Sequence, residues 1–305
     1  MGQLRENAPM RLKADLTLFL TALIWGSAFT AQRVAGQQGA VYLFNGMRFL
    51  LGSLVLLPLA MRTKRIGRMM ERISRAQWLW MGVAGVVLFV GTALQQVGLQ
   101  YTTAGHAGFL TSLYVVFVPF VLFIGWRERS HWQALAAVGL AGGGAYLLSA
   151  GGRLEVQRGD TLELLGAAFW ALHVVILGKF ASRYDAITFS IGHFLVGAVL
   201  NGMVGLWLEH PAVVAPWALT GAILYTGIFS VGIGYTLQVW AQKHTPPTDA
   251  ALILSLEAVF GVLFGFVFLG EKLTLTQMMG CGFMLGGVLL TQLRGRNQSK
   301  IVLVK

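Results

Sequence analysis

One carboxylate, Glu257, lies inside a long apolar segment of the sequence, residues 250–269. It is about eight residues from the start of that segment, which is near the middle of a membrane-spanning helix that rises 1.5 Å per residue. An ionised carboxylate at that depth costs several kcal/mol unless it is protonated or paired. We therefore expect Glu257 to carry a proton or to face a cationic group. The alternative is a protonated glutamate that hydrogen-bonds within a helix contact.

Two basic side chains also fall within apolar segments. Arg48 lies about seven residues inside the segment 41–61, where it could contact an anion or pair with a carboxylate. A long arginine can also reach the membrane surface from that depth, and this snorkelling is the favoured interpretation. His193 occupies the aligned place in the second half of the chain. It could relay protons, although a hydrogen-bonded packing role is favoured.

Two tryptophans, Trp25 and Trp170, lie 145 residues apart, each within an apolar segment. Tryptophans in the middle of a span differ from the interfacial tryptophans of membrane proteins. They could form the apolar walls of a substrate cavity, or they could simply pack in the core. His173 follows Trp170 by three residues, so both side chains share one face of a helix.

Two glutamines, Gln95 and Gln238, lie 143 residues apart and approach opposite ends of their predicted spans. They could be polar rims or gates on opposite sides of one cavity. An interhelical hydrogen-bonding role is equally compatible with their positions. Tyr114 precedes Glu257 by the same 143 residues, so the carboxylate and the phenol occupy aligned places.

These residues belong to a chain too apolar to be a water-soluble globule. Apolar types make up 56% of its 305 residues, charged types make up 11%, and the mean hydropathy is +0.67. A typical soluble domain is about 25% charged. A membrane-crossing helix needs about 20 apolar residues, so we predict an all-α membrane protein with ten spans joined mostly by short loops. The predicted spans cover residues 16–35, 41–61, 78–99, 104–124, 132–149, 162–180, 187–208, 217–240, 250–269 and 276–293.

The net charge of +11 is best explained by membrane orientation. Basic residues collect on the cytoplasmic side of membrane proteins. If the N-terminus is cytoplasmic, 18 of the 23 lysines and arginines fall on that side, four fall outside and Arg48 lies within a span. This distribution predicts ten spans with both termini in the cytoplasm. We expect a multi-pass protein of the cell membrane, either a bacterial inner membrane or another plasma membrane.

The sequence contains an internal repeat with an offset of 143 residues. Residues 102–148 align with 245–291 without gaps, and 12 of the 47 positions are identical. A unit of five spans is odd, so its second copy enters the membrane from the opposite side. Such inverted repeats are typical of secondary transporters. The predicted division is a cytoplasmic N-tail 1–15, a first repeat 16–149, a linker 150–161, a second repeat 162–293 and a basic C-tail 294–305.

Paired small-residue motifs occur at aligned places in the fifth and tenth spans. They are Gly139-x-x-x-Gly143 and Gly282-x-x-x-Gly286. Small residues let helix backbones approach closely, so we predict that these glycines form a helix contact, either within one chain or between two chains.

Three segments resemble EamA-type permeases of the drug/metabolite transporter superfamily. They are LTALIWGSAFTAQRVA in the first span, AGFLTSLYVVFVP in the fourth and ALILSLEAVFGVLFGFVFLGE in the ninth. The resemblance implies that spans one, three, four, six, eight and nine line a central cavity, whereas spans five and ten form a scaffold. The family often has proline after the glutamate of the ninth span. Ala258 stands there in this chain, so a proline kink is not implied.

The leading hypothesis is a secondary transporter that moves small organic metabolites or drugs by alternating access. The resemblance implies export, and the depth of Glu257 suggests proton coupling. A channel or a facilitative permease without ion coupling is the alternative. An intramembrane enzyme is less consistent with the sequence, because the six histidines are scattered singly. The expected partners are a small-molecule substrate and the lipid bilayer. We expect no cofactor, no metal and no nucleic acid, and a homo-oligomer is left open.

Overall fold

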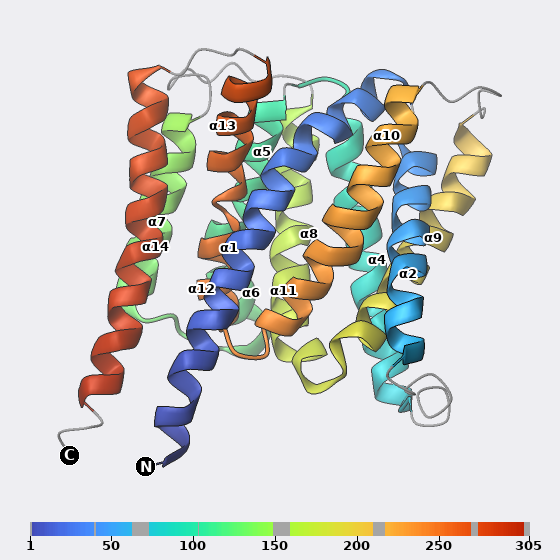
Figure 1. The fold of residues 1–305 in the computed structure, drawn as a ribbon. Coiled ribbons are helices and arrows are strands. Elements are labelled where there is room, and N and C mark those ends of the chain that lie inside the picture. The colour runs from blue at the N-terminus through green and yellow to red at the C-terminus, as the bar shows by residue number, and fades with distance from the viewer. Residues whose placement is uncertain are drawn as a thin grey trace.

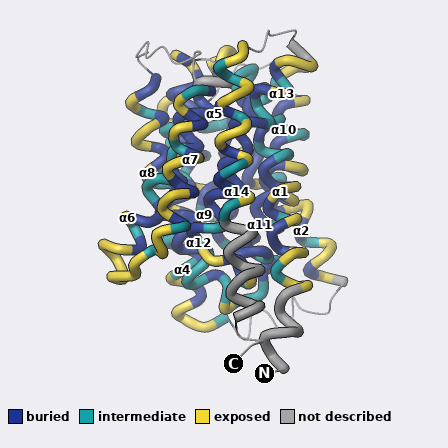
Figure 2. Tube along the Cα trace, turned by 90° about the vertical axis from the view of Figure 1, so that its left-hand side faces the viewer, coloured by how far each residue is buried: buried dark blue, intermediate teal, exposed yellow. Residues whose placement is uncertain are grey.

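A computed structural model describes residues 2–39, 41–62, 73–102, 104–148, 159–209, 217–269 and 274–301, and within these ranges all regular secondary structure is helical. The helices run roughly along one direction as a single bundle (Figure 1). Buried residues occupy the inside of the bundle and exposed residues its periphery (Figure 2). Residues 150–158 of the predicted linker 150–161 lie outside the described residues, and its last two residues are already in the helix that begins at Asp160.

Eight helical stretches among the described residues are long and apolar enough to cross a membrane. Two shorter apolar stretches, Trp132–Leu148 and Leu275–Leu290, fall where the fifth and tenth spans are predicted. The uninterrupted helices are α1 (Gly2–Gln37), α2 (Tyr42–Arg62), α4 (Arg75–Gly98), α7 (Trp132–Leu148), α8 (Asp160–Lys179), α9 (Ala186–Leu208) and α14 (Leu275–Ile301). A short 3₁₀ turn, η2 (Ala181–Arg183), joins α8 to α9.

The fourth and ninth spans are each interrupted near the middle. The fourth consists of α5 (Ala104–Ser112) and α6 (Tyr114–Trp126), and the ninth of α12 (Pro247–Leu254) and α13 (Glu257–Leu269). Backbone hydrogen bonds at the breaks close tighter, 3₁₀-like turns, such as Leu113 N–H to Leu110 O and Ala258 N–H to Ser255 O. The ninth span is therefore interrupted without a proline at position 258.

The eighth span contains a wide π-helical segment. It consists of α10 (Trp217–Tyr225), the π-helix η3 (Thr226–Tyr235) and α11 (Thr236–Ala241). The aligned residues of the first repeat, 83–92, lie in the regular helix α4. π-helical turns are rare and are frequent at functional sites.

Helices α7 and α14 pack against each other, but not through the predicted glycines. A Cβ atom added to Gly144 would lie 2.6 Å from the carbonyl oxygen of Gly280, and one added to Gly287 would lie 2.7 Å from that of Ala137. No described atom outside its own helix lies within 4 Å of such an atom at the predicted motif positions. Those positions are Gly139, Gly143, Gly282 and Gly286. The close contact within the chain therefore uses a neighbouring face of each helix, and a contact of the predicted glycines between two chains stays a prediction.

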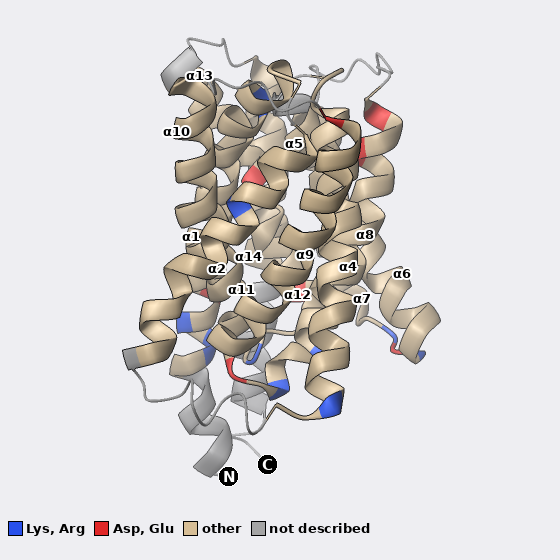
Figure 3. Ribbon diagram, turned by 90° about the vertical axis from the view of Figure 1, so that its right-hand side faces the viewer, with Lys and Arg blue, Asp and Glu red and all other residues tan. Residues whose placement is uncertain are grey.

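Helix α1 begins and α14 ends at the same end of the bundle, which we call the terminal end (Figure 1). The lysine and arginine residues that the structure describes gather mainly near this end (Figure 3). The arrangement fits the predicted placement of both termini on one side of a membrane.

Candidate functional site

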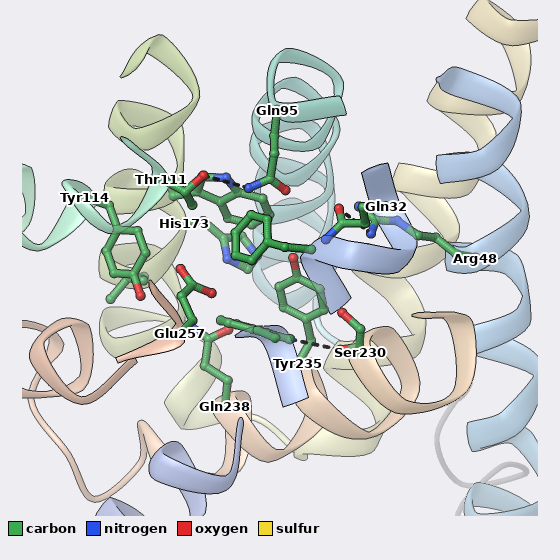
Figure 4. A pocket seen from close by; sticks show the side chains of 14 residues that line it. Gln32, Arg48, Gln95, Thr111, Tyr114, His173, Ser230, Tyr235, Gln238 and Glu257 are labelled. Carbon is green, nitrogen blue, oxygen red and sulfur yellow. Dashed lines mark hydrogen bonds between the residues drawn. The ribbon is translucent and has the colours of Figure 1, made fainter. Parts of the chain in front are cut away.

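A buried cavity lies in the middle of the bundle (Figure 4). Its volume is about 30 Å³, which is room for one or two water molecules. Eight of the nine candidate residues named from the sequence contribute to its wall, His193 being the exception, and seven of the ten predicted spans supply lining residues. The full lining is Trp25, Phe29, Gln32, Arg48, Gln95, Thr111, Tyr114, Trp170, His173, Val174, Ser230, Tyr235, Gln238 and Glu257.

Aromatic rings form one wall of the cavity around Tyr235. The ring centroid of Trp25 lies 4.6 Å from that of Tyr235, and the centroid of Trp170 lies 6.1 Å away with nearly parallel planes. The indole N–H of Trp25 donates to the carbonyl oxygen of Ser230, in the π-helix, at 3.1 Å. The structure thus brings the two aligned tryptophans close to one tyrosine.

Glu257 and Tyr114 lie side by side, each at the start of the second half of an interrupted span (Figure 4). Both side chains are 3% exposed, and the Tyr114 hydroxyl has no hydrogen-bond partner among the described residues. Residues at aligned positions meet in this way when they lie on the axis that relates two repeats. The pair therefore marks the centre of the inverted repeat.

Arg48 does not snorkel, so the favoured interpretation was wrong. The side chain is 2% exposed, and one guanidinium nitrogen donates to Oε1 of Gln32 at 2.9 Å. The guanidinium also lies over the rings of Phe44 and Phe49, at 5.3 and 5.2 Å from their centroids. An amide and two ring faces hold the cation in the core, which removes the need to reach the surface. The second span thus lines the cavity, unlike in the arrangement that the family resemblance implies.

Two histidines lie next to each other beside the cavity. His173 contacts Trp170 and Tyr235 edge-on, and neither of its ring nitrogens has a hydrogen-bond partner among the described residues. The centroid of His193 lies 5.7 Å from that of His173. The Nδ1 atom of His193 is hydrogen-bonded to the carbonyl oxygen of Phe189 at 2.8 Å, as the favoured packing role requires. Nε2 of His193 also lacks a partner among the described residues, but of the two histidines it is His173 that lines the cavity and can offer a nitrogen to a molecule bound there.

The aligned glutamines differ in their partners. Gln95 donates from Nε2 to Oγ1 of Thr111 at 2.9 Å, and Thr111 donates from Oγ1 to Oε2 of Glu163 at 3.2 Å. Gln238 is fully buried, and both polar atoms of its amide lack a partner among the described residues. Its amide is available to hydrogen-bond a molecule in the cavity.

Several cavity residues were not singled out by sequence reasoning. Gln32 and Ser230 have no motif that marks them. Glu163 lies next to the cavity wall and is the second residue of its predicted span, which starts at 162. A charge at that position looks like a solvated helix end, so only the packing of α8 against its neighbours reveals that it is buried.

Comparison with known proteins gives a consistent result over nearly the whole chain. The model of the EamA-like transporter family matches twice, at residues 12–150 and 157–293. A protein of Archaeoglobus fulgidus named "Uncharacterized transporter" is 31% identical over 284 residues, which cover 93% of this chain and 87% of the relative. The "Uncharacterized transporter YvbV" of Bacillus subtilis is 26% identical, with 94% of each chain covered.

One solved crystal structure has the same fold. Its TM-score is 0.76 at 19% sequence identity, and the match covers 94% of this chain and 98% of the other. At 19% sequence identity, this similarity establishes a shared fold only.

Proposed function

We propose, from the premise that this chain belongs to the EamA-like transporter family, that it is a secondary transporter of small organic molecules that works by alternating access. The chain is a multi-pass membrane protein. One observation carries the proposal: side chains at aligned positions of two repeats converge on a single buried cavity. A central site between inverted repeats is what alternating access needs, because either repeat can rock to expose it.

The size of the cavity supports a transport cycle with moving walls. Sites for small molecules usually measure about 300–1,000 Å³, and this cavity measures about 30 Å³. A substrate therefore enters only if the helices separate. The interruptions of the fourth and ninth spans and the π-helix of the eighth all border the cavity, and irregular turns of this kind can act as hinges.

The cavity chemistry favours a substrate with an apolar body and polar ends. Trp25, Trp170 and Tyr235 offer ring faces, and Gln238 offers an unpartnered amide. Glu257 and Arg48 lie on opposite sides of Tyr235 (Figure 4). A molecule that carries a positive and a negative group around an apolar part would satisfy both.

The finer features of the proposal have separate supports. Export is taken from the family resemblance, and proton coupling from the buried carboxylate of Glu257. A bacterial inner membrane or another plasma membrane, with both termini in the cytoplasm, is supported by the basic terminal end (Figure 3). A small-molecule substrate and the lipid bilayer are the proposed partners, and the proposal includes no catalytic step and no cofactor.

A ligand screen followed by a flux assay tests the proposal. Purified protein is heated with metabolite pools, because a ligand that binds the native state raises the unfolding temperature. The ligand is then tested for counterflow in proteoliposomes, which a carrier catalyses and a channel does not. We expect Trp170→Ala to abolish both signals. The matched control is Trp207→Ala, since Trp207 is 82% exposed on the outside of the bundle. A wild-type protein that binds but shows no counterflow would contradict the proposal.

Proton coupling is tested with the same ligand and a pH gradient. We expect the gradient to drive accumulation in the wild type and in the control Glu128→Gln, whose residue is half-exposed and pairs with Lys179. Glu257→Gln should remove the response to the gradient. Flux that ignores the gradient in the wild type and in Glu257→Gln alike would overturn the coupling role.

A further inference from the structure

Glu163 is a second buried carboxylate, and the transport site described above does not use it. Its side chain is fully buried in the first turn of α8. The neighbouring helix α4 passes so close that a Cβ atom added to Gly98 would lie 2.8 Å from Oε1 of Glu163. A glycine at position 98 thus leaves room for the carboxylate between the two helices.

A directional chain of hydrogen bonds joins Glu163 to the cavity wall. The amide Nε2 of Gln95 donates to the hydroxyl oxygen of Thr111, and that hydroxyl donates its proton to Oε2 of Glu163. All three side chains are at most 5% exposed. Gln95 and Thr111 also line the cavity (Figure 4). The chain therefore has one end at the cavity and the other at a carboxylate outside it.

The second oxygen of Glu163 makes this site unusual. Oε1 has no hydrogen-bond partner among the described residues. A buried ionised carboxylate with a bare oxygen costs several kcal/mol, whereas a proton on the group removes most of that cost. The geometry therefore suits a carboxyl group that gains and loses a proton.

The other titratable side chains around Glu163 are few. Asp160, one turn earlier on α8 and 8% exposed, is the acidic neighbour that interacts with it. Helix α4 has only uncharged side chains over the segment 89–98, and α5 carries His106, whose side chain lies outside the described residues. Helices α6 and α12 also pack on α8 and carry Tyr114, at the cavity, and Asp249, at the terminal end.

The aligned positions of the other repeat do not form this chain of hydrogen bonds. The counterpart of Thr111 is Leu254 and that of Glu163 is Leu18, and both leucines are fully buried. The counterpart of Gln95 is Gln238, whose amide has no partner among the described residues. The core at this position can evidently be built from apolar side chains, so the carboxylate is not needed for packing.

We propose that Glu163 is a second proton-exchange site and that its protonation changes what Gln95 presents to the cavity. This inference rests on the proposed transport function. When Glu163 is ionised, Thr111 donates to it and Gln95 donates to Thr111. When Glu163 is protonated, its own O–H donates to Thr111, so the Thr111 hydroxyl must find an acceptor. The Gln95 amide then turns to accept with Oε1 and leaves its NH₂ group toward the cavity.

Infrared difference spectroscopy of the full-length protein in proteoliposomes tests this inference without a substrate. The difference between low and high pH should contain a protonated-carboxyl C=O band that shifts in D₂O. Glu163→Gln should remove that band, and Glu257→Gln should leave it. Survival of every such band in Glu163→Gln would overturn the inference.

Substitutions of Thr111 and Gln95, which leave Glu163 in place, test the hydrogen-bond chain. Thr111→Val removes the hydrogen-bond partner and should move the Glu163 band to higher frequency, whereas Thr111→Ser should restore it. Gln95→Leu, which alters only the cavity end of the chain, should also displace the band. The matched control is Thr92→Val, because the Thr92 hydroxyl bonds only carbonyl groups of its own helix. A band that ignores both Thr111→Val and Gln95→Leu would refute the link to the cavity.

The result is separable from that of the transport assay. A protein that moves no solute but shows the Glu163 band would contradict the proposed function and support the proton site. A protein that shows counterflow without any band assignable to Glu163 would support the proposed function and contradict the proton site.

Discussion

The two repeats share a backbone plan but differ in the chemistry at aligned positions. Both interrupt a helix at the same place, and the next residue is Tyr114 in one repeat and Glu257 in the other. The positions aligned with the hydrogen-bond chain Gln95–Thr111–Glu163 are Gln238, Leu254 and Leu18, and the Gln238 amide has no partner among the described residues. The common plan builds the cavity, and the differences give it a polarity that an exact repeat would lack.

The ends of the bundle differ in the same way. At the terminal end, the Thr245 hydroxyl donates to Asp15 at 2.8 Å, and Arg11 bridges Asp15 to Asp249. The aligned residues at the other end are Asp160 and Thr102, and the hydroxyl of Thr102 has no partner among the described residues. The terminal end is thus held by a polar clasp, comprising Arg11, Asp15, Thr245 and Asp249, and the hydrogen bond from Thr245 to Asp15 has no counterpart between Thr102 and Asp160.

The largest expected difference is in ligand affinity, between substitutions of the aligned residues Glu257 and Tyr114. Glu257→Gln removes the charge from a hydrogen-bonding group, and hydrogen bonds to charged groups contribute about 1.5–3 kcal/mol. We expect ligand affinity to fall by about 10- to 150-fold. Tyr114→Phe removes a neutral hydroxyl, so the loss should be about fivefold. Titration calorimetry with the ligand from the screen measures both, and equal losses would show that the two positions are chemically equivalent.

The next comparison uses the aligned glycines Gly234 and Gly91. A Cβ atom at Gly234 would lie 2.7 Å from the indole nitrogen of Trp25, whereas one at Gly91 would find its nearest neighbour at 3.5 Å. Gly234→Ala should displace Trp25 and destabilise the fold by about 1–3 kcal/mol. Gly91→Ala should be neutral or stabilise by up to about 1 kcal/mol, because alanine favours a helix interior. Thermal unfolding measures both, and a reversed order would contradict the packing described.

The smallest expected effect concerns the clasp. Thr245→Val removes one hydrogen bond, worth about 1 kcal/mol, and should open the terminal end about fivefold more often. The aligned change Thr102→Val should have little effect. The measurement is the rate at which a water-soluble thiol reagent labels Val174→Cys from the terminal side, with Cys281 replaced by alanine. Equal rates in the two variants would show that the clasp does not hold this end closed.

The sequence predicted the helical class, the repeat and the cavity residues because each leaves a local signal. A charge or tryptophan in an apolar run is visible without coordinates, as Glu257 and Trp25 illustrate. Arg48 was a candidate, but the favoured snorkelling interpretation was wrong, because the length of an arginine permits two outcomes and only the positions of Gln32 and Phe49 decide between them. Glu163 was missed because burial at a helix end depends on neighbouring helices.

The π-helix and the glycine contacts could not be predicted from the sequence, because they too depend on how neighbouring helices pack. The residues 226–235 contain no signal that separates a π-helix from an α-helix, and the first repeat keeps an α-helix at the aligned place. The motif at Gly139 and Gly143 was recognised, but the contact uses the adjacent Gly144. A shift of one residue rotates the contact by about 100° around a helix, and this rotation is set by tertiary packing.

The most direct test of the account asks whether the central cavity opens to both sides of the membrane. Val174, which lines the cavity and is 3% exposed, is replaced by cysteine in a protein without Cys281. A membrane-impermeant thiol reagent is then applied to vesicles of each orientation. Alternating access predicts labelling from both sides, slowed in each case by the ligand from the screen. Labelling from one side only, or from neither, would contradict it.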